Sequence, residues 1–334
     1  MNENKNPPIL VLGNGGWGTA LAMTLQSNGH PVRVWGHDAA YCEEIEATRE
    51  NRKYLPGVQI PEGIVFGDDL SSLAAGTDTV FSVIPTQFLR STLQNLKEQL
   101  PPQGLYVTCS KGFEKKTLEL PSRIIRSCFD SAGIAVLSGP SHAEETSRGL
   151  PTTVVVASDE DSLAAKIQQI ISTETFRVYT STDARGVEVA GASKNVIALA
   201  AGISDGLGYG DNARAALVCR GAAEITRLGE ALDCGGEAFS GLSGIGDLVA
   251  TCTSTHSRNH KVGYQIGQGE TLEEILSSSE KVAEGVETTR SMHQLAEKIS
   301  VELPITSEVY RVLFENKPPR QAVGDLMGRE LKRE

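Results

Sequence analysis

Residues 9–22 read Ile9-Leu-Val-Leu-Gly13-Asn-Gly15-Gly-Trp-Gly18-Thr-Ala-Leu-Ala22, and no other stretch of the chain says more about its architecture. The glycines form a G-x-G-x-x-G pattern between an apolar run and a helix-like run. In this pattern the first glycine allows a tight turn, the second lets backbone N–H groups approach a pyrophosphate, and the third lets the helix pack closely on the strand. The N-terminus of that helix favours negative charge. With a second apolar run at Val32–Trp35, the stretch predicts a β-α-β unit that binds a dinucleotide.

Apolar, β-branched runs recur along the first half of the chain, and helix-like segments separate most of them. Near-continuous apolar strands that alternate with helices predict a mostly parallel sheet covered on both faces. We therefore expect an α/β fold with a Rossmann-like, doubly wound sheet. The predicted strands lie near Ile9–Leu12, Val32–Trp35, Ile64–Phe66, Thr79–Ile84, Leu105–Thr108, Ile134–Leu137, Thr153–Ala157 and Phe176–Tyr179.

The strand pattern stops at about Asp183, and the remaining sequence is rich in Ala, Leu and Glu. We interpret its Gly-rich stretches, Gly202–Gly210 and Gly235–Gly246, as turns between helices. The expected organisation is a dinucleotide-binding domain of residues 1–183 and an all-helical substrate and catalytic domain of residues 184–334. A chain of 334 residues is long enough for about two domains.

Composition argues against several classes of function. The net charge is −11 and the 31 Lys and Arg residues are scattered, so no basic stripe indicates a nucleic-acid partner. The N-terminus is polar and no apolar run approaches the length of a membrane span, which predicts a cytoplasmic protein without an integral membrane segment. The six cysteines form no C-x-x-C pair, so we expect reduced, mostly buried thiols. His256 and His260 lie four residues apart without further ligands between them, and we expect no metal.

Polar and Gly-rich residues follow several predicted strands, at the sheet edge where ligands of open α/β folds bind. They are Gly36-His37-Asp38, Pro85-Thr-Gln, Ser110-Lys111-Gly112 and Ser138-Gly139-Pro-Ser141. Each could be a plain turn, but together they are expected to ring one edge of the sheet. After the second strand, an acidic residue would accept from the ribose of NAD and a cation would accommodate the 2′-phosphate of NADP. The chain has both, His37 beside Asp38, so the cofactor is NADP or NAD.

Lys194 lies in a helix-like run of small and apolar residues, Gly186–Ala201. On a helix its neighbours three and four residues away are Ala190, Gly191, Ile197 and Ala198. A lysine in these surroundings either extends to solvent along the apolar surface or is held in a tight cleft. In a cleft, burial would favour the neutral amine, which suits proton exchange with a hydroxyl or carbonyl group. Lys194 is therefore the candidate acid/base residue.

Hydroxyls, a guanidinium and an amide are close together in Thr251-Cys-Thr-Ser-Thr-His-Ser257-Arg258-Asn259. This set matches the oxygens of a phosphate, although a solvated loop would have a similar composition. Upstream, Asp247 follows the Gly-rich stretch Gly241–Gly246. It either caps the next helix, orients Lys194 or accepts a hydrogen bond from a substrate hydroxyl.

With these residues in place, the chain closely resembles the bacterial NAD(P)-dependent glycerol-3-phosphate dehydrogenases. The matching blocks follow the family's order and cover nearly the whole chain. They are Gly13-Asn-Gly-Gly-Trp-Gly-Thr-Ala20, Trp35-Gly-His37, Ser110-Lys-Gly112, Ser138-Gly-Pro-Ser141, Gly191-Ala-Ser-Lys-Asn-Val-Ile-Ala198, Gly244-Ile-Gly-Asp-Leu248, Thr251-Cys-Thr253, Ser257-Arg-Asn259 and Val282-Ala-Glu-Gly285.

The resemblance implies reversible hydride transfer between sn-glycerol 3-phosphate and dihydroxyacetone phosphate, in support of phospholipid synthesis. It implies proton transfer by Lys194, with Lys111 and Asp247 as further catalytic residues. The implied substrate contacts are Lys111, Gly139, Ser141, Lys194, Asp247, Ser257, Arg258 and Asn259. The implied cofactor contacts, beside the glycines Gly13, Gly15 and Gly18, are Gly16, Trp17, His37, Lys111, Ala143, Arg258, Val282 and Glu284.

Two other functions remain open from the residues alone. A related two-domain hydroxy-acid dehydrogenase would bind a substrate carboxylate where we expect a phosphate, and the choice of substrate separates the two. A non-catalytic, dinucleotide-binding redox sensor would bind cofactor without turnover, and it would have no evident need for Lys111, Lys194 and Asp247 together. The Ala- and Gly-rich helices would permit a homodimer.

Overall fold

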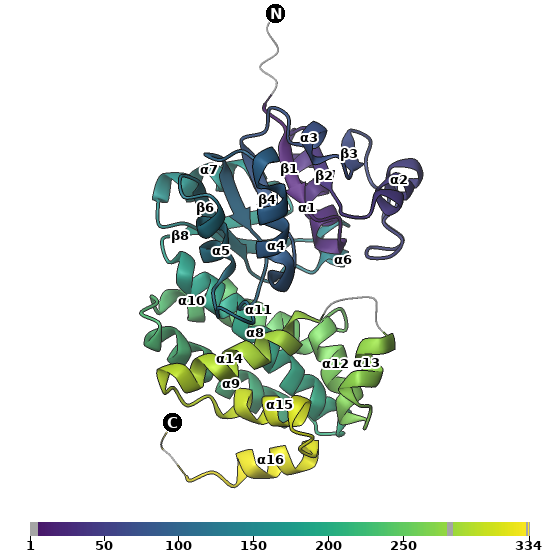
Figure 1. The fold of residues 1–334 in the computed structure, drawn as a ribbon. Coiled ribbons are helices and arrows are strands. Elements are labelled where there is room, and N and C mark those ends of the chain that lie inside the picture. Colours follow the sequence, from purple (N-terminus) through teal and green to yellow (C-terminus); the bar gives the residue numbers. More distant parts are fainter. Residues whose placement is uncertain (1–5, 279–282, 332, 334) are drawn as a thin grey trace, which may run out of the picture. The chain divides into compact units, whose positions relative to one another are not determined.

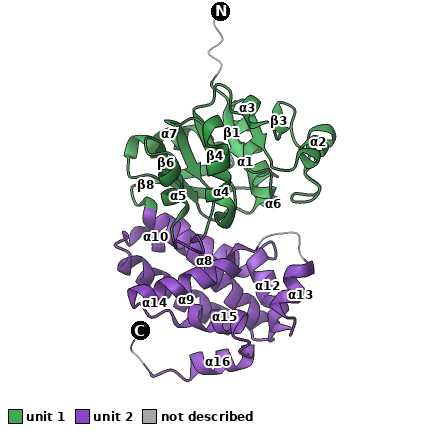
Figure 2. Ribbon diagram, viewed as in Figure 1, with its two compact units in different colours: residues 1–111, 119–184 green, residues 112–118, 185–334 purple. Residues whose placement is uncertain are grey.

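The structure is a computed structural model that describes residues 6–278, 283–331 and 333. The chain divides into two compact units (Figure 2), one of Met1–Lys111 with Glu119–Ala184 and one of Gly112–Leu118 with Arg185–Glu334. The short segment Gly112–Leu118 thus lies with the helical unit, although it is far from the rest of that unit in sequence. There the carbonyl oxygen of Phe113 accepts a hydrogen bond from Ser291 Oγ at 3.2 Å.

In the first unit (Figure 1), the described residues form one eight-stranded sheet in the order β3-β2-β1-β4-β5-β6-β7-β8. All adjacent strands are parallel except β6 and β7, which are antiparallel. The predicted runs are all strands and the expectation of a mostly parallel sheet is confirmed. The strands are β1 (Ile9–Leu12), β2 (Val32–Trp35), β3 (Ile64–Gly67), β4 (Thr79–Ser82), β5 (Leu105–Thr108), β6 (Gly133–Ser138), β7 (Thr152–Ala157) and β8 (Phe176–Ser181).

Helices cover both faces of this sheet, which explains the near-continuous apolar strands. In β1, Ile9 and Val11 join one core cluster with side chains of α1 and α7. Leu10 and Leu12 point the other way, into a cluster with side chains of α3, α4 and α5. The helical segments of the unit are α1 (Gly16–Ser27), α2 (Ala39–Thr48), α3 (Leu70–Leu73), α4 (Thr86–Leu96), a 3₁₀ turn (Lys97–Gln99), α5 (Pro121–Cys128), α6 (Ala143–Thr146) and α7 (Asp161–Ile171).

The glycine turn lies where the order of the sheet reverses. From β1 the chain first adds β2 and β3 on one side and then β4 and β5 on the other. Such a switch point leaves a crevice outside the carboxyl ends of the strands, and this is where dinucleotides bind in doubly wound folds. Because β1, β2, β4, β5 and β6 are parallel, the segments that follow them leave the sheet at this same edge.

The regular secondary structure of the second unit, within its described residues, is helical, as expected. Its helix α8 is buried over nearly its whole length, which explains why its sequence is small and apolar on every side. The helices are α8 (Ala184–Gly206), α9 (Asp211–Ala231), α10 (Glu237–Ser240), a π-helical turn (Leu242–Gly246), α11 (Asp247–Thr253), α12 (Arg258–Gly267), α13 (Leu272–Ser278), α14 (Glu284–Ile299), α15 (Pro304–Phe314) and α16 (Pro319–Met327).

The interpretation of Gly202–Gly210 and Gly235–Gly246 as turns between helices is correct only in part, because the helices are interrupted at residues 207–210 and 235–236 while most of the remaining residues are helical. Helix α8 continues to Gly206, and the second stretch contains α10 and the π-helical turn. A Cβ atom on Gly202 would lie 2.0 Å from the His260 carbonyl oxygen, and one on Gly263 would lie 2.1 Å from that of Leu199. These glycines therefore allow α8 and α12 to cross at backbone contact, so they serve packing instead of chain reversal.

Two further sequence expectations concern the whole chain. All six cysteines are free thiols, and Cys42, Cys109, Cys128 and Cys252 are buried, as predicted. Among the described residues, no helix combines the length and the apolar character that crossing a bilayer requires.

Candidate active site

The glycine turn of the first unit ends in a helix N-terminus without a side-chain cap. Gly15 is the N-cap of α1 and, as a glycine, has no side chain that could accept a capping hydrogen bond. A Cβ atom on Gly15 would meet nothing within 4 Å, whereas one on Gly18 would lie 1.9 Å from the Gly13 carbonyl oxygen. Gly13 has a φ of 114°, which favours glycine. The turn therefore leaves open space in front of backbone N–H donors, a geometry that fits pyrophosphate oxygens.

Two more of the predicted cofactor residues lie against this turn. A Cβ atom on Gly16 would lie 2.9 Å from the Tyr54 carbonyl oxygen and 3.7 Å from Ala143 Cβ. Ala143 is the first residue of α6, so this short helix begins beside the start of α1. The Trp17 ring is half-buried and packs on the sheet core, with its centroid 6.4 Å from that of Phe176.

His37 and Asp38 are both exposed just after β2. Asp38 is the N-cap of α2, and its Oδ1 accepts the Tyr41 N–H at 3.1 Å. One carboxylate oxygen is thus used to begin the helix, while the charge remains at the strand end where a ribose is bound in this fold class. The structure places both His37 and Asp38 at the carboxyl end of β2.

The predicted substrate residues of the first unit meet at one carbonyl oxygen. Lys111 Nζ donates to the Gly139 carbonyl oxygen at 3.2 Å, and Ser141 Oγ donates to the same oxygen at 3.1 Å. Gly139 has a φ of 136°, and a Cβ atom there would lie 2.9 Å from Val154 Cα, so no other residue fits without strain. The ends of β5 and β6 therefore hold an ammonium and a hydroxyl together.

In the second unit, Lys194 is buried and held by two side chains of α11. Its Nζ donates to Asp247 Oδ1 at 2.5 Å and to Thr251 Oγ1 at 2.8 Å. Thr251 Oγ1 in turn donates to the Asp247 carbonyl oxygen at 2.6 Å. Lys194 is 7% exposed, so it does not extend to solvent. The carboxylate favours the charged ammonium, which opposes the effect of burial.

The N-terminus of α12 has the polarity of an anion site. The N-cap Ser257 accepts the His260 N–H at 3.2 Å through Oγ, and Asn259 Oδ1 accepts the Gly285 N–H at 3.0 Å. The oxygen atoms of both side chains accept hydrogen bonds from backbone N–H groups. The Ser257 hydroxyl proton and the Asn259 NH₂ group can therefore act as donors to a ligand. The exposed Arg258 adds a guanidinium at the first helical position. With the helix dipole, this set suits a phosphate.

The start of α14 lies against both α12 and the lysine-bearing helix α8. A Cβ atom on Gly285 would lie 2.7 Å from Asn259 Oδ1 and 2.9 Å from the carbonyl oxygen of Asn195, the residue after Lys194. Helices α8, α12 and the start of α14 therefore meet here. Glu284, a predicted cofactor residue, is the first residue of α14, and Val282 lies outside the described residues.

Models of one protein family match both parts of the chain. The model described as the NAD-dependent glycerol-3-phosphate dehydrogenase N-terminus matches residues 8–164, and the model of the C-terminus matches residues 183–324. The chain belongs to the glycerol-3-phosphate dehydrogenase family. The resemblance noted from the sequence motifs is thereby confirmed.

Individual relatives agree with the family models over nearly the full length. The chain is 50% identical to "Glycerol-3-phosphate dehydrogenase [NAD(P)+]" of Chlorobium phaeobacteroides (strain BS1), over 98% of each chain. It is also 50% identical to the protein of that name from Geobacillus kaustophilus (strain HTA426), over 98% of this chain and 96% of the relative. A crystal structure of glycerol-3-phosphate dehydrogenase from Coxiella burnetii has a TM-score of 0.93 at 36% identity, covering 97% of this chain and 99% of that one.

A D-mandelate dehydrogenase structure, in contrast, shares the fold alone. Its TM-score is 0.62 at 12% identity, with 95% of this chain and 99% of that chain covered. The hydroxy-acid alternative therefore has a related architecture but no sequence relationship of the kind seen within the glycerol-3-phosphate dehydrogenase family.

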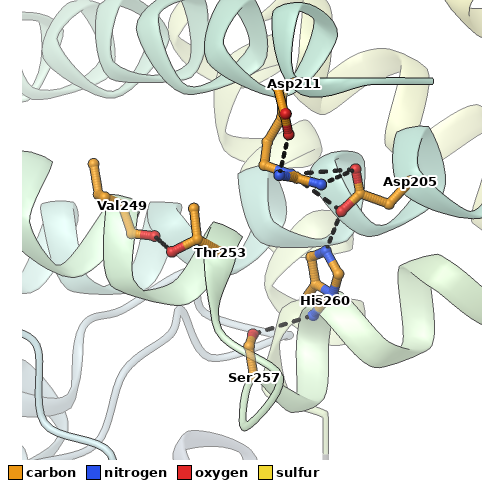
Figure 3. A network of polar contacts seen from close by, with 7 residues as sticks. Asp205, Asp211, Val249, Thr253, Ser257 and His260 are labelled. Atoms are coloured by element: carbon orange, nitrogen blue, oxygen red, sulfur yellow. Dashed lines mark hydrogen bonds and ion pairs between the residues drawn. The ribbon is translucent and has the colours of Figure 1, made fainter.

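Our reading of the sequence missed Thr251 as a partner of Lys194. Asp247 and Thr251 are four residues apart, so on one helix they share a face, and this spacing was the available signal. It also missed the role of His260, whose Nε2 lies 2.8 Å from Asp205 Oδ2 (Figure 3). Within the described residues, no group of three or more His, Cys, Asp and Glu side chains could hold a metal ion.

Two buried thiols lie near candidate residues of this dehydrogenase, Cys109 close to Lys111 and Cys252 close to Lys194. Burial raises the pKa of each thiol to about 12. Because the thiolate is the nucleophile, neither cysteine is reactive at neutral pH. Neither thiol is therefore a candidate for the chemistry of the site.

Proposed function

We propose that this chain is an NAD(P)-dependent glycerol-3-phosphate dehydrogenase that interconverts sn-glycerol 3-phosphate and dihydroxyacetone phosphate. The observation that carries the proposal is the buried Lys194, which is hydrogen-bonded to Asp247 and Thr251. In the same unit, the N-terminus of α12 offers donors that suit a phosphate. Family membership and 50% identity to relatives of that name support the same reaction.

The proposed chemistry centres on the substrate's carbonyl oxygen. The dinucleotide, when bound, supplies a hydride to the carbonyl carbon or accepts one from the alcohol carbon. In the reducing direction, negative charge develops on the carbonyl oxygen. The Lys194 ammonium lowers the barrier because it stabilises this charge more strongly in the transition state than it stabilises the ketone. Lys194 then donates its proton to give the alcohol, and in the oxidising direction its amine takes that proton. Asp247 and Thr251 hold Nζ in place throughout.

We assign the substrate phosphate to Ser257, Arg258 and Asn259 at the start of α12. Their donors and the helix dipole orient the substrate, and orientation of this kind lowers the barrier by holding the reacting groups in place. We further assign Lys111, Gly139 and Ser141 to substrate binding, with Lys111 also a catalytic and cofactor contact.

For the cofactor, we assign the pyrophosphate to the turn of Gly13, Gly15, Gly16 and Gly18, because its open space and N–H donors fit that group. Trp17, His37, Ala143, Arg258, Val282 and Glu284 complete the proposed contacts. NADP or NAD can be accommodated, since His37 and Asp38 favour different riboses.

We also propose that the reaction supplies the glycerol backbone for phospholipids and takes place in the cytoplasm. The free thiols support a reducing compartment.

The deciding experiment follows loss of reduced-cofactor absorbance with dihydroxyacetone phosphate, with NADPH and NADH in parallel and unphosphorylated dihydroxyacetone as control. We expect oxidation that requires the phosphate group. Arg258→Ala should raise the KM for dihydroxyacetone phosphate with little change in the binding of unphosphorylated dihydroxyacetone. Turnover of a 2-keto acid in place of the phosphate ester would favour the hydroxy-acid dehydrogenase, and tight cofactor binding without turnover would favour the redox sensor.

A further inference from the structure

Asp205 lies on α8, on the same face as Lys194 and about three helical turns beyond it. Its carboxylate joins two other helices. Oδ2 lies 2.8 Å from His260 Nε2 on α12, and Oδ1 accepts from Arg214 NH2 on α9 at 3.0 Å. Figure 3 shows Asp205 and His260 pointing toward each other. One side chain of the lysine-bearing helix thus contacts the helix that begins with the proposed phosphate residues.

His260 is held at both ends within the first turn of α12. Its backbone N–H donates to Ser257 Oγ at 3.2 Å, and its ring is bound to Asp205. Ser257 is itself one of the proposed phosphate donors. A displacement of the His260 ring would therefore be transmitted directly to the N-cap and, through it, to Arg258 and Asn259.

The ring contact is shielded from water. The His260 side chain is 18% exposed and the Asp205 side chain 12%, so their interaction is stronger than that of a surface pair. Arg214 also donates from NH1 to Asp211 at 2.8 Å, and Asp211 is a solvent-exposed residue that does not contact His260. Asp205 therefore has a shielded contact with His260, toward the candidate site, and a contact with Arg214, which in turn binds the exposed Asp211.

The backbone crossing of α8 and α12 includes the first turn of α12. A Cβ atom on Gly202 would lie 2.0 Å from the His260 carbonyl oxygen, and further close contacts lie at Gly206, Gly263 and Gly267, toward the middle and end of α12. The backbone contact limits how closely the two helices approach. The ring of His260 adds a hydrogen-bonded contact with Asp205 of α8, on the turn that includes Ser257, and this contact holds the start of α12 on α8.

We infer that Asp205 and His260 are positioning residues that place the phosphate-binding start of α12 relative to Lys194. The inference rests on the proposed function, because it takes the start of α12 as the phosphate subsite. Neither residue is assigned a contact with substrate or cofactor. Their loss should weaken binding of the phosphate group without changing the proton-transfer step.

The test compares His260→Phe, which keeps a ring of similar size but has no nitrogen, with His260→Gln, which returns a donor to the position. We expect His260→Phe to raise the KM for dihydroxyacetone phosphate about tenfold, a loss of ~1.4 kcal/mol. The competitive inhibition constant of inorganic phosphate should rise by the same factor. We expect kcat within about twofold of the unmodified protein, and His260→Gln should recover most of the affinity.

Asp211→Asn is the matched control. It changes a carboxylate of the same network, but one that binds Arg214 and not His260. It should leave both constants and the dissociation constant of NADPH unchanged. If His260→Phe does not yield folded protein, Asp205→Asn, which conserves volume and removes the charge, is measured instead, and its KM for dihydroxyacetone phosphate should rise.

The inference would be overturned by an unchanged KM and phosphate inhibition constant in a folded His260→Phe or Asp205→Asn protein, or by a fall in kcat at constant KM. Equal losses in His260→Phe and His260→Gln would also contradict it, since they would indicate packing instead of the hydrogen bond. Unmodified protein that binds NADPH but does not reduce dihydroxyacetone phosphate would contradict the proposed function itself. Normal turnover with an unaffected His260→Phe variant would reject the positioning role alone.

Discussion

Lys194 is a buried cation whose charge is balanced by Asp247. Because of this pairing, the effect of Lys194 on turnover can be measured separately from its effect on the free energy of unfolding. Replacing Lys194 with Ala removes the proposed proton donor and also leaves the Asp247 carboxylate buried without its partner. We expect kcat to fall by about 10²–10⁴-fold, the range of general acid–base catalysis. The unpaired charge should lower the free energy of unfolding by about 3–5 kcal/mol. Steady-state kinetics and urea unfolding measure the two effects.

The double variant Lys194→Ala with Asp247→Asn isolates the catalytic effect. Without the carboxylate charge, most of the lost stability should return while kcat stays as low as in the single variant. Affinity for NADPH should be unchanged in both variants. Turnover that recovers together with stability would show that Lys194 acts through the fold and not on the substrate.

Asp38 allows a second test at the scale of one residue, because its charge and its capping role can be separated. Asn is as good an N-cap as Asp, so Asp38→Asn should keep the hydrogen bond to the Tyr41 N–H and the start of α2. It removes a negative charge from the end of β2, where a 2′-phosphate would lie. We expect the ratio of kcat/KM for NADPH over NADH to rise about tenfold, or ~1.4 kcal/mol. An unchanged ratio would remove Asp38 from cofactor selection.

At the scale of elements, the crossing of α8 and α12 depends on glycine. A Cβ atom on Gly202 would lie 2.0 Å from the backbone oxygen of His260, so Gly202→Ala forces the two helices apart. We expect a loss of about 1–3 kcal/mol in unfolding free energy, despite the better helix propensity of Ala. Because the same displacement moves the start of α12, the KM for dihydroxyacetone phosphate should rise as well.

Gly324 provides the matched control for this crossing. It is an exposed residue inside α16, and a Cβ atom there would meet nothing within 4 Å. Gly324→Ala should therefore stabilise the protein by about 0.5–1 kcal/mol and leave the kinetics unchanged. If the two substitutions had the same effect on urea unfolding, close approach at Gly202 would not be what the glycine provides.

The glycine at the helix crossing illustrates which features of the fold could not be predicted from the sequence. The eight strands could be predicted because each has buried apolar residues in its own short run. These residues are continuous in β1, β4 and β5, which are buried on both faces, and they alternate with exposed ones in the edge strands β3 and β8. The role of Gly202 could not be predicted, because a glycine in a turn and a glycine at a helix crossing look alike until the partner helix is known. The antiparallel pairing of β6 with β7 was likewise not visible in either strand.

For the candidate site, how far the arrangement of residues could be predicted depended on how local the signal was. The glycine turn is contained in a few consecutive residues, and the structure gives it the expected open space. The contact between Lys194 and Asp247 joins residues far apart in sequence, so the residues alone left Asp247 with three open roles. The contact between Asp205 and His260 gave no sequence signal beyond the helical spacing of Asp205 from Lys194.

At the scale of the whole molecule, stability should depend on pH through the buried Glu224 of α9. Its carboxylate is 4% exposed and accepts hydrogen bonds from the Ile305 N–H and, at 3.2 Å, from the Thr306 N–H at the start of α15. Burial raises the pKa of Glu224 from 4.5 to about 7, although those hydrogen bonds act in the opposite direction. Between these two pH values the folded protein holds a proton that the unfolded chain has lost.

Stability therefore falls as pH rises through this window, because the folded state binds more protons than the unfolded state. A shift of this size corresponds to about 3 kcal/mol, fully expressed above the folded pKa and absent below the unfolded one. Glu224→Gln cannot ionise, so the unfolding free energy of this variant minus that of the unmodified protein should increase by about that amount from pH 4 to pH 8. Urea unfolding at several pH values measures the difference, in which contributions from all other groups cancel. Parallel pH profiles for the two proteins would mean that the hydrogen bonds at the start of α15 fully offset burial and leave the pKa of Glu224 at its unfolded value.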